Sequence, residues 1–263
     1  ADPAIEADIK TCEAMAEGLE GQFSGRVATL EDKELLELVS GLEKLDTVIG
    51  RLGTFAFLNF TTQAKSPEAS AFLQKIKEVG SRIGKRLVFF ELEWGKVEAD
   101  RAEALLASPT LAHYRHYLAS LRRYAPHLLS QAEETLLIEK SPVGRSSWTN
   151  LFEKIMGYLK FGDKGRSEEE VLSDLYNPER EVRRQAADDL TQGLQSQLHV
   201  LTHLFNTLLA EKMIDDRLRD YDSWVSSMNL ANELEDRTVQ VLIDTVTSRY
   251  DIPQRYYRLK KQL

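Results

Sequence analysis

The sequence of 263 residues lacks most of the motifs from which an activity can be read. Cys12 is its only cysteine, so the chain can form neither an internal disulfide nor a thiolate metal cage. It contains no H-E-x-x-H, no G-x-S-x-G and no phosphate-binding loop. From these absences we expect no catalytic residue and no metal ligand in this span, and a reducing compartment, the cytoplasm.

Long apolar runs and a basic surface are also missing. No apolar stretch approaches the roughly 20 residues that cross a bilayer, and the acidic start ADPAIEADIK does not resemble a signal peptide. The formal net charge is -8, with Lys and Arg scattered along the chain. Because binding to phosphate backbones needs a basic patch, we expect no nucleic-acid partner and no membrane partner.

What the sequence does have is helical periodicity. Apolar residues recur at three- and four-residue intervals over most of its length, which predicts an all-α fold of antiparallel helical hairpins and a bundle. Residues 32–59 and 66–94 form the clearest predicted hairpin. Within it, LVFFELEW (87–94) is rich in residues that favour strands, but it continues the helical spacing, so we expect a helix there. Further helices are predicted over 2–20, 100–107, 109–125, 130–140, 146–159, 167–175, 235–250 and from 253 onward.

Residues 177–221 show the longest helical pattern. Asn177 and Pro178 mark its start, and the apolar residues from Val182 to Leu209 fall on one stripe. The pattern predicts one continuous helix with one buried face.

Two breaks organise the chain. Pro, Gly and Ser cluster near 141–146, which predicts an N-terminal helical lobe over 1–143 and a second helical unit over 144–263. The turn signal KFGDKGRS predicts at most a minimal β-hairpin near 158–166.

Four residues are candidates for a substrate cleft. His199 and His203 stand four apart, a spacing that lets two imidazoles reach one metal ion, but Val200 occupies the position of the catalytic Glu of a zincin helix. We therefore expect them on the polar face of a helix. Arg115 and His116 belong to the densest cationic cluster, which could hold a peptide carboxylate or a phosphate but fits a solvated face better.

Three segments carry a resemblance to a known family. They are LAHYRHYLASLRRYAPHLLSQAEETLLIEKSPVGRSSWTNLFEKI (111–155), NPEREVRRQAADDL (177–190) and IPQRYYRLKKQL (252–263). Most characteristic are the runs Tyr114 to Leu118, Pro126 to Ser130, Gly144 to Trp148 and Tyr256 to Lys260. In order and content the segments resemble the N-terminal half of the oligoendopeptidase F family of zinc metallopeptidases. The turn FGDKG departs from that pattern by being shorter than the usual hairpin.

The resemblance implies a zinc endopeptidase that cleaves short peptides in a deep cleft. In that family the zinc helix lies downstream of the features matched here, so no catalytic residue or metal ligand can be assigned within these 263 residues. Zinc is implied for the full-length enzyme, with none bound by this span. The partners implied are short peptides and a C-terminal catalytic portion.

Two hypotheses remain open. The chain is either the N-terminal part of such a peptidase, inactive in isolation, or a stand-alone helical module that binds peptides or proteins without cleaving them. The first residue is Ala rather than Met, and the last apolar stripe stops in mid-pattern. Both features favour the first hypothesis.

Overall fold

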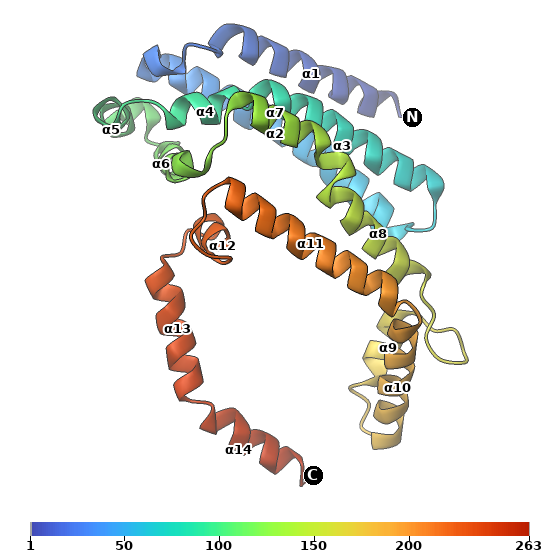
Figure 1. The fold of residues 1–263 in the computed structure, drawn as a ribbon. Coiled ribbons are helices and arrows are strands. Elements are labelled where there is room, and N and C mark those ends of the chain that lie inside the picture. Colours follow the sequence, from blue (N-terminus) through green and yellow to red (C-terminus); the bar gives the residue numbers. More distant parts are fainter. Residues whose placement is uncertain (1, 263) are drawn as a thin grey trace.

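The computed structural model describes residues 2–262, and its regular structure there is helical (Figure 1). This confirms the predicted all-α fold. The α-helices are α1 Pro3–Phe23, α2 Asp32–Thr62, α3 Pro67–Leu87, α4 Phe89–Gly95, α5 Ala99–Ala107, α6 Arg115–Arg123, α7 Gln131–Lys140, α8 Arg145–Tyr158, α9 Glu168–Asp174, α10 Arg180–Ser196, α11 Leu198–Leu218, α12 Ser226–Ala231, α13 Asp236–Ser248 and α14 Asp251–Lys260. Four short 3-10 turns lie between them: η1 Val27–Thr29, η2 Pro109–Leu111, η3 Ala125–His127 and η4 Ser141–Val143.

Helices α1, α2 and α3 form the first layer and lie side by side (Figure 1). Small residues at their contacts, Cys12, Ala16 and Ala56, are fully buried and let the helices approach closely. Leu45 and Phe60 of α2 pack against Ile76 of α3 and its neighbours. The predicted antiparallel hairpin of α2 and α3 is confirmed.

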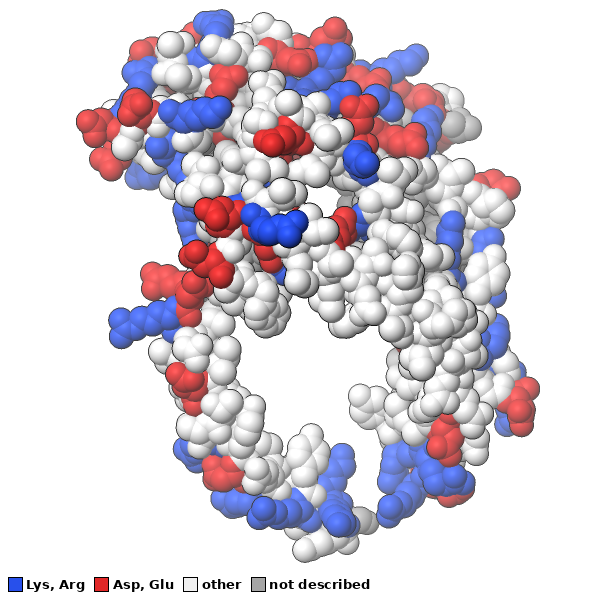
Figure 2. Space-filling model, viewed as in Figure 1, with Lys and Arg blue, Asp and Glu red and all other residues white. Residues whose placement is uncertain are grey.

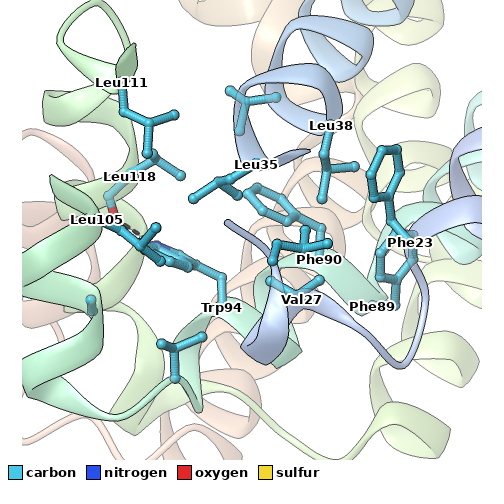
Figure 3. Close-up of a cluster of buried hydrophobic side chains, with 14 residues drawn as sticks. Phe23, Val27, Leu35, Leu38, Phe89, Phe90, Trp94, Leu105, Leu111 and Leu118 are labelled. Atoms are coloured by element: carbon cyan, nitrogen blue, oxygen red, sulfur yellow. Dashed lines mark hydrogen bonds between the residues drawn. The ribbon is translucent and has the colours of Figure 1, made fainter. Parts of the chain in front are cut away.

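A second cluster surrounds Trp94 (Figure 3). The Trp94 indole is fully buried, and its Nε1–H donates to the carbonyl oxygen of Leu118 at 2.8 Å. Arg122 donates to the carbonyl oxygen of Trp94 at 2.8 Å, and its guanidinium lies 5.6 Å from the ring centroid. These contacts fasten α6 onto α4. Residues 87–94 are thus helical as expected, although Val88 interrupts the single helix predicted over 66–94 and both Phe89 and Phe90 are buried beyond it.

Helix α7 crosses α3 and leads through η4 into α8. Its predicted capping box is confirmed, because the Ser130 backbone N–H donates to the Glu133 carboxylate at 2.9 Å while the Ser130 side chain accepts from the Glu133 N–H. Ser81 on α3 donates to the carbonyl oxygen of Ile138 at 2.8 Å and joins the two helices. The turn η4 coincides with the predicted boundary at 143/144, and the division into two domains there stays a prediction.

The prediction of one continuous helix over 177–221 was wrong. The chain bends at Gln197 (φ -116, ψ 13), where α10 ends and α11 begins in a different direction (Figure 1). Before the bend α10 packs against α9, and after it α11 packs against α8, so the apolar residues do not face one core. Leu204 is buried, but Leu198 and Phe205 of the predicted stripe are 58% and 64% exposed.

Strand-like structure within 2–262 is limited to one bridge between Phe161 and Arg166, which confirms a minimal hairpin at most. Gly162 and Gly165 adopt positive φ angles of 67° and 61°, which only glycine accepts without strain. Phe161 is fully buried and packs with Val171 and Ala186 in a small cluster between the turn, α9 and α10.

The last helices leave the body of the molecule. Helix α13 makes its main contact with α12, and α13 and α14 curve round so that the chain borders an open space (Figures 1 and 2). Of the helices described, none combines the length and apolar character needed to cross a membrane.

Gly193 marks the closest approach of α10 to the turn. A Cβ built there would lie 2.3 Å from Cδ1 of the buried Phe161 ring. Replacing glycine with alanine inside a helix normally stabilises it by about 1 kcal/mol. For Gly193→Ala we expect the opposite sign, a loss of about 1–3 kcal/mol, because the ring or the helix must move.

Urea unfolding of Gly193→Ala measures this effect. Gly50→Ala in α2 is the matched control, since its Cβ would meet nothing within 4 Å and should stabilise the protein. Equal behaviour of the two variants contradicts the contact.

Candidate functional site

The candidate site is the open space bordered by α11, α13 and α14. Figure 2 shows mainly uncharged surface around it, with Lys and Arg at the end where α14 lies. Helices α11, α13 and α14 expose an unusual number of large apolar side chains for helices of a folded protein. They are Leu198, Phe205, Leu209, Met213, Ile214, Leu218, Val241, Leu242, Ile243, Val246, Ile252, Tyr256, Tyr257 and Leu259.

A buried ion pair fixes the end of α11 relative to α7. The Arg219 guanidinium donates to both carboxylate oxygens of Glu134, at 2.6 Å to Oε1 and 3.0 Å to Oε2. Its Nε donates to Asp215 at 3.2 Å. The Glu134 residue is only 6% exposed, so the two charges must be paired there.

The pairing controls the protonation of Glu134. Burial by itself raises the pKa of this carboxyl group, but the Arg219 hydrogen bonds, the Leu129 backbone N–H and the Arg219 charge outweigh burial and lower the pKa below its ordinary value. The same bond raises the pKa of Arg219. Both groups are therefore charged at neutral pH.

His127 reinforces this junction. Its Nδ1–H donates to the carbonyl oxygen of Arg219 at 2.8 Å, while Arg219 donates back to the carbonyl oxygen of His127 at 3.2 Å. The imidazole ring stacks on Tyr221 with centroids 3.9 Å apart. The two hydrogen bonds and the ring stacking thus hold the turn after α11 against η3.

Beyond the junction, polar contacts orient α12 and the start of α13. Asp216, 9% exposed, accepts from Lys212 at 2.5 Å and from Ser227 of α12 at 3.0 Å. The buried Asn229 side chain donates to Asp236, in the first turn of α13, at 2.7 Å. These bonds set the direction in which α13 leaves the body.

His116 and Arg115 are adjacent in sequence but contact different parts of the structure. The exposed His116 ring reaches both carboxylate oxygens of Glu233 at 2.9 Å, and Ser120 donates to Glu233 at 2.8 Å. Arg115 donates from Nε to the carbonyl oxygen of Leu106, at the end of α5. The structure thus shows a contact between α6 and the α12–α13 connection, and a role for either residue in substrate binding stays a prediction.

His199 and His203 both lie on exposed positions of α11. The His203 ring meets Trp148 of α8 edge-on, with centroids 5.7 Å apart. Over residues 2–262, no three His, Cys, Asp or Glu side chains are arranged to hold a metal ion. The described residues therefore do not fit a zinc site, and we assign them no role in a zinc-dependent reaction.

The chain is similar to known proteins over most of its length. The family model described as Oligopeptidase F matches residues 93–161. Oligopeptidase PepF from Bacillus subtilis is 22% identical over 99% of this chain, and group B oligopeptidase PepB from Streptococcus agalactiae is 24% identical over 92% of it. The chain is similar to the N-terminal part of the oligoendopeptidase F family. The match covers about 40% of the curated relatives, so the chain corresponds to their N-terminal part.

The fold of the chain is shared with solved structures. The crystal structure of oligoendopeptidase-F from Enterococcus faecium superimposes with a TM-score of 0.85, covering 100% of this chain and 53% of that one at 18% identity. A putative peptidase from Chlamydophila abortus superimposes with a TM-score of 0.62 over 100% of this chain and 45% of its own. At these identities the likeness concerns the fold alone.

A substitution in the Glu134–Arg219 pair tests how strongly this contact joins α7 to the end of α11. Glu134→Gln leaves the partly buried Arg219 guanidinium with only the exposed Asp215 as a counter-charge, and we expect a loss of about 3 kcal/mol in the free energy of unfolding at pH 7. Glu139→Gln, in the same helix, removes an exposed partner of Lys85 at 3.3 Å and should cost less than about 1 kcal/mol.

The stability that ionised Glu134 contributes should decrease in acid. Because the pKa of Glu134 is lowered by folding, its stabilisation is complete above the pKa of an unfolded Glu and is lost as the pH falls through the folded value. The difference between wild type and Glu134→Gln, measured by urea unfolding, should shrink in acid. A difference that is independent of pH would contradict the ionised pair.

Proposed function

We propose that this chain is the N-terminal, cleft-forming part of an oligoendopeptidase F-like zinc metalloendopeptidase that acts on short peptides. The observation that carries the proposal is the exposed apolar surface of α11, α13 and α14 in a chain that spans about 40% of its curated relatives. Apolar surface of this extent normally marks an interface. A C-terminal catalytic portion is the partner that such relatives supply.

The distribution of apolar residues on α13 supports the proposal that this surface is an interface. Four of its five apolar side chains, at positions 239, 242, 243 and 246, share one side of a helix, whereas Arg237, Gln240, Val241 and Asp244 fall on another. Figure 2 shows uncharged surface on the side of this segment that borders the open space. The apolar side therefore faces the volume into which a further portion of chain would fit.

In this proposal the chain contributes shape rather than chemistry. It walls one side of the space in which peptides are cleaved, and the catalytic portion provides the zinc ligands and the general base. The first layer α1–α3 and the Glu134–Arg219 junction keep that wall in place. A location in the cytoplasm is part of the same proposal.

The coding sequence tests the proposal directly. We expect H-E-x-x-H within the next one to two hundred codons, and we expect the protein extended through it to hold one zinc ion and to cleave a fluorogenic short peptide. The 263-residue chain alone should do neither. A stop codon after Leu263 would support the alternative, a stand-alone peptide- or protein-binding module, and chelator-sensitive cleavage by the short chain would contradict the assignment.

A substitution on α13 tests the interface. Leu242 is 63% exposed, so Leu242→Asp should leave the melting temperature of the 263-residue chain nearly unchanged. In the extended protein, where the proposal buries this side chain, we expect a loss of about 2 kcal/mol or more together with reduced activity. Calorimetry and peptide cleavage give the two readouts.

Gln240→Asp is the matched control, because Gln240 lies on the opposite side of the same helix. It should affect neither form of the protein strongly. Equal effects of the two substitutions in the extended protein would refute the proposed interface.

A further inference from the structure

A cavity of about 710 Å³ lies away from α13 and α14, between α2, the α3–α4 junction and the segment that begins α6. Its lining includes Leu45, Ile83 and Phe90, which are almost completely buried and give it an apolar floor. A volume of this size admits a dipeptide or another small molecule. Neither the sequence motifs nor the family relationship assign a role to it.

The polar part of the lining carries one sign of charge. Glu43 and Asp46 stand three apart on α2 and so share one side of that helix, and Glu91 approaches from α4. The lining residues include no Lys or Arg, and the remaining polar side chains are those of His113, Tyr114 and Tyr117. An apolar floor thus meets an acidic rim with no Lys or Arg among the lining residues.

The pKa of Tyr117 indicates that carboxylates of the rim lie close enough to act on the same group. Burial, followed by the charges of Glu91 and Asp46, raises the pKa of the Tyr117 phenol to about 12. Carboxylates from two different helices therefore act on one hydroxyl group of a third. Burial and the charge of Glu134 also raise the pKa of Glu91, and the charge of Arg219 offsets them only in part.

The partners of the three carboxylates differ. Glu43 accepts a hydrogen bond from the Tyr114 hydroxyl at 2.5 Å. Within residues 2–262 the structure has no hydrogen bond or salt bridge to the carboxylate of Asp46 or Glu91. These two groups are available for a ligand.

We propose that this cavity binds the protonated amino end of a short peptide with apolar side chains. The ammonium group donates to Asp46 and Glu91, and the first side chains lie on the floor of Leu45, Ile83 and Phe90. The cation follows from the cavity itself, whereas the assignment to a peptide rests on the proposed function. The site would hold peptides on the wall of the peptidase, apart from its zinc.

Other ligand classes fit less well. An anion would be repelled by three carboxylates, and a neutral apolar ligand would remove water from Asp46 and Glu91 without supplying a counter-charge. An ammonium group on an apolar body satisfies both the floor and the rim.

Titration calorimetry of the 263-residue chain at pH 7 and low salt tests this proposal. The probe is phenylalanyl-leucine amide, which keeps a free amino end and has no carboxylate. N-acetyl-phenylalanyl-leucine amide has the same side chains without the charge, and 2-phenylethylamine has the charge without a peptide bond. We expect the free dipeptide amide to bind at least about tenfold more tightly than either comparison compound.

Paired variants locate the site. Asp46→Asn combined with Glu91→Gln should weaken binding of the dipeptide amide at least about tenfold and leave the weak binding of the acetylated compound unchanged. Asp163→Asn, in the turn between Phe161 and Arg166, removes an exposed carboxylate outside the cavity and should bind as wild type does. Because ionised Glu91 is disfavoured by its surroundings, its neutralisation should not lower the melting temperature, and this measurement confirms that the variant is folded.

Each other outcome overturns the inference. No binding of the dipeptide amide at millimolar concentration, equal binding of the acetylated compound, or equal weakening by Asp163→Asn excludes the cation site. Equal affinity for 2-phenylethylamine excludes a peptide as its ligand. None of these results depends on cleavage or on the downstream reading frame, so failure of this site and failure of the proposed function are distinguishable.

Discussion

The Glu134–Arg219 ion pair is the contact on which the position of the second half of the chain depends. It joins α7, which packs on the first layer, to the end of α11, from which α12 and α13 follow. A charge pair this well buried is costly to break, because each partner would remain desolvated without the other. The surrounding hydrogen bonds of His127 and Asp215 restrict its geometry further. The open space beside α13 therefore keeps its outline through a polar contact rather than through a hydrophobic core.

Much of the fold could be predicted from local sequence. Helix caps such as Ser130 with Glu133, and the paired periodicities of α2 and α3, depend on residues a few positions apart, so the sequence records them directly. The bend at Gln197 could not be predicted in this way. The apolar spacing continues through it without change, and only the separate neighbours of α10 and α11 explain why Leu198 and Phe205 remain exposed.

The site residues show the same contrast between what local sequence records and what depends on distant neighbours. His199, His203, Arg115 and His116 attracted attention because of their chemistry and spacing, yet the structure engages His116 with Glu233 and Arg115 with a backbone carbonyl group. Glu134 and Arg219 are 85 positions apart, and Glu91 and Asp46 come from different helices. No periodicity links such pairs. The family resemblance supplied the proposed function, whereas the acidic cavity appears only when three helices are placed together.

The attachment of α13 and α14 has a mechanical consequence. These helices span about 20 Å and 15 Å at 1.5 Å per residue, and they join the body through α12 and through Glu233, whose φ of 55° marks a sharp turn of the backbone. A rotation of only 10° about that turn would carry the end of α14 through about 5 Å, if the two helices moved as one arm. The His116–Glu233 contact lies almost at the pivot, so a small displacement there is magnified along the arm. The position of the end of α14 therefore depends on the geometry of the contact between His116 and Glu233.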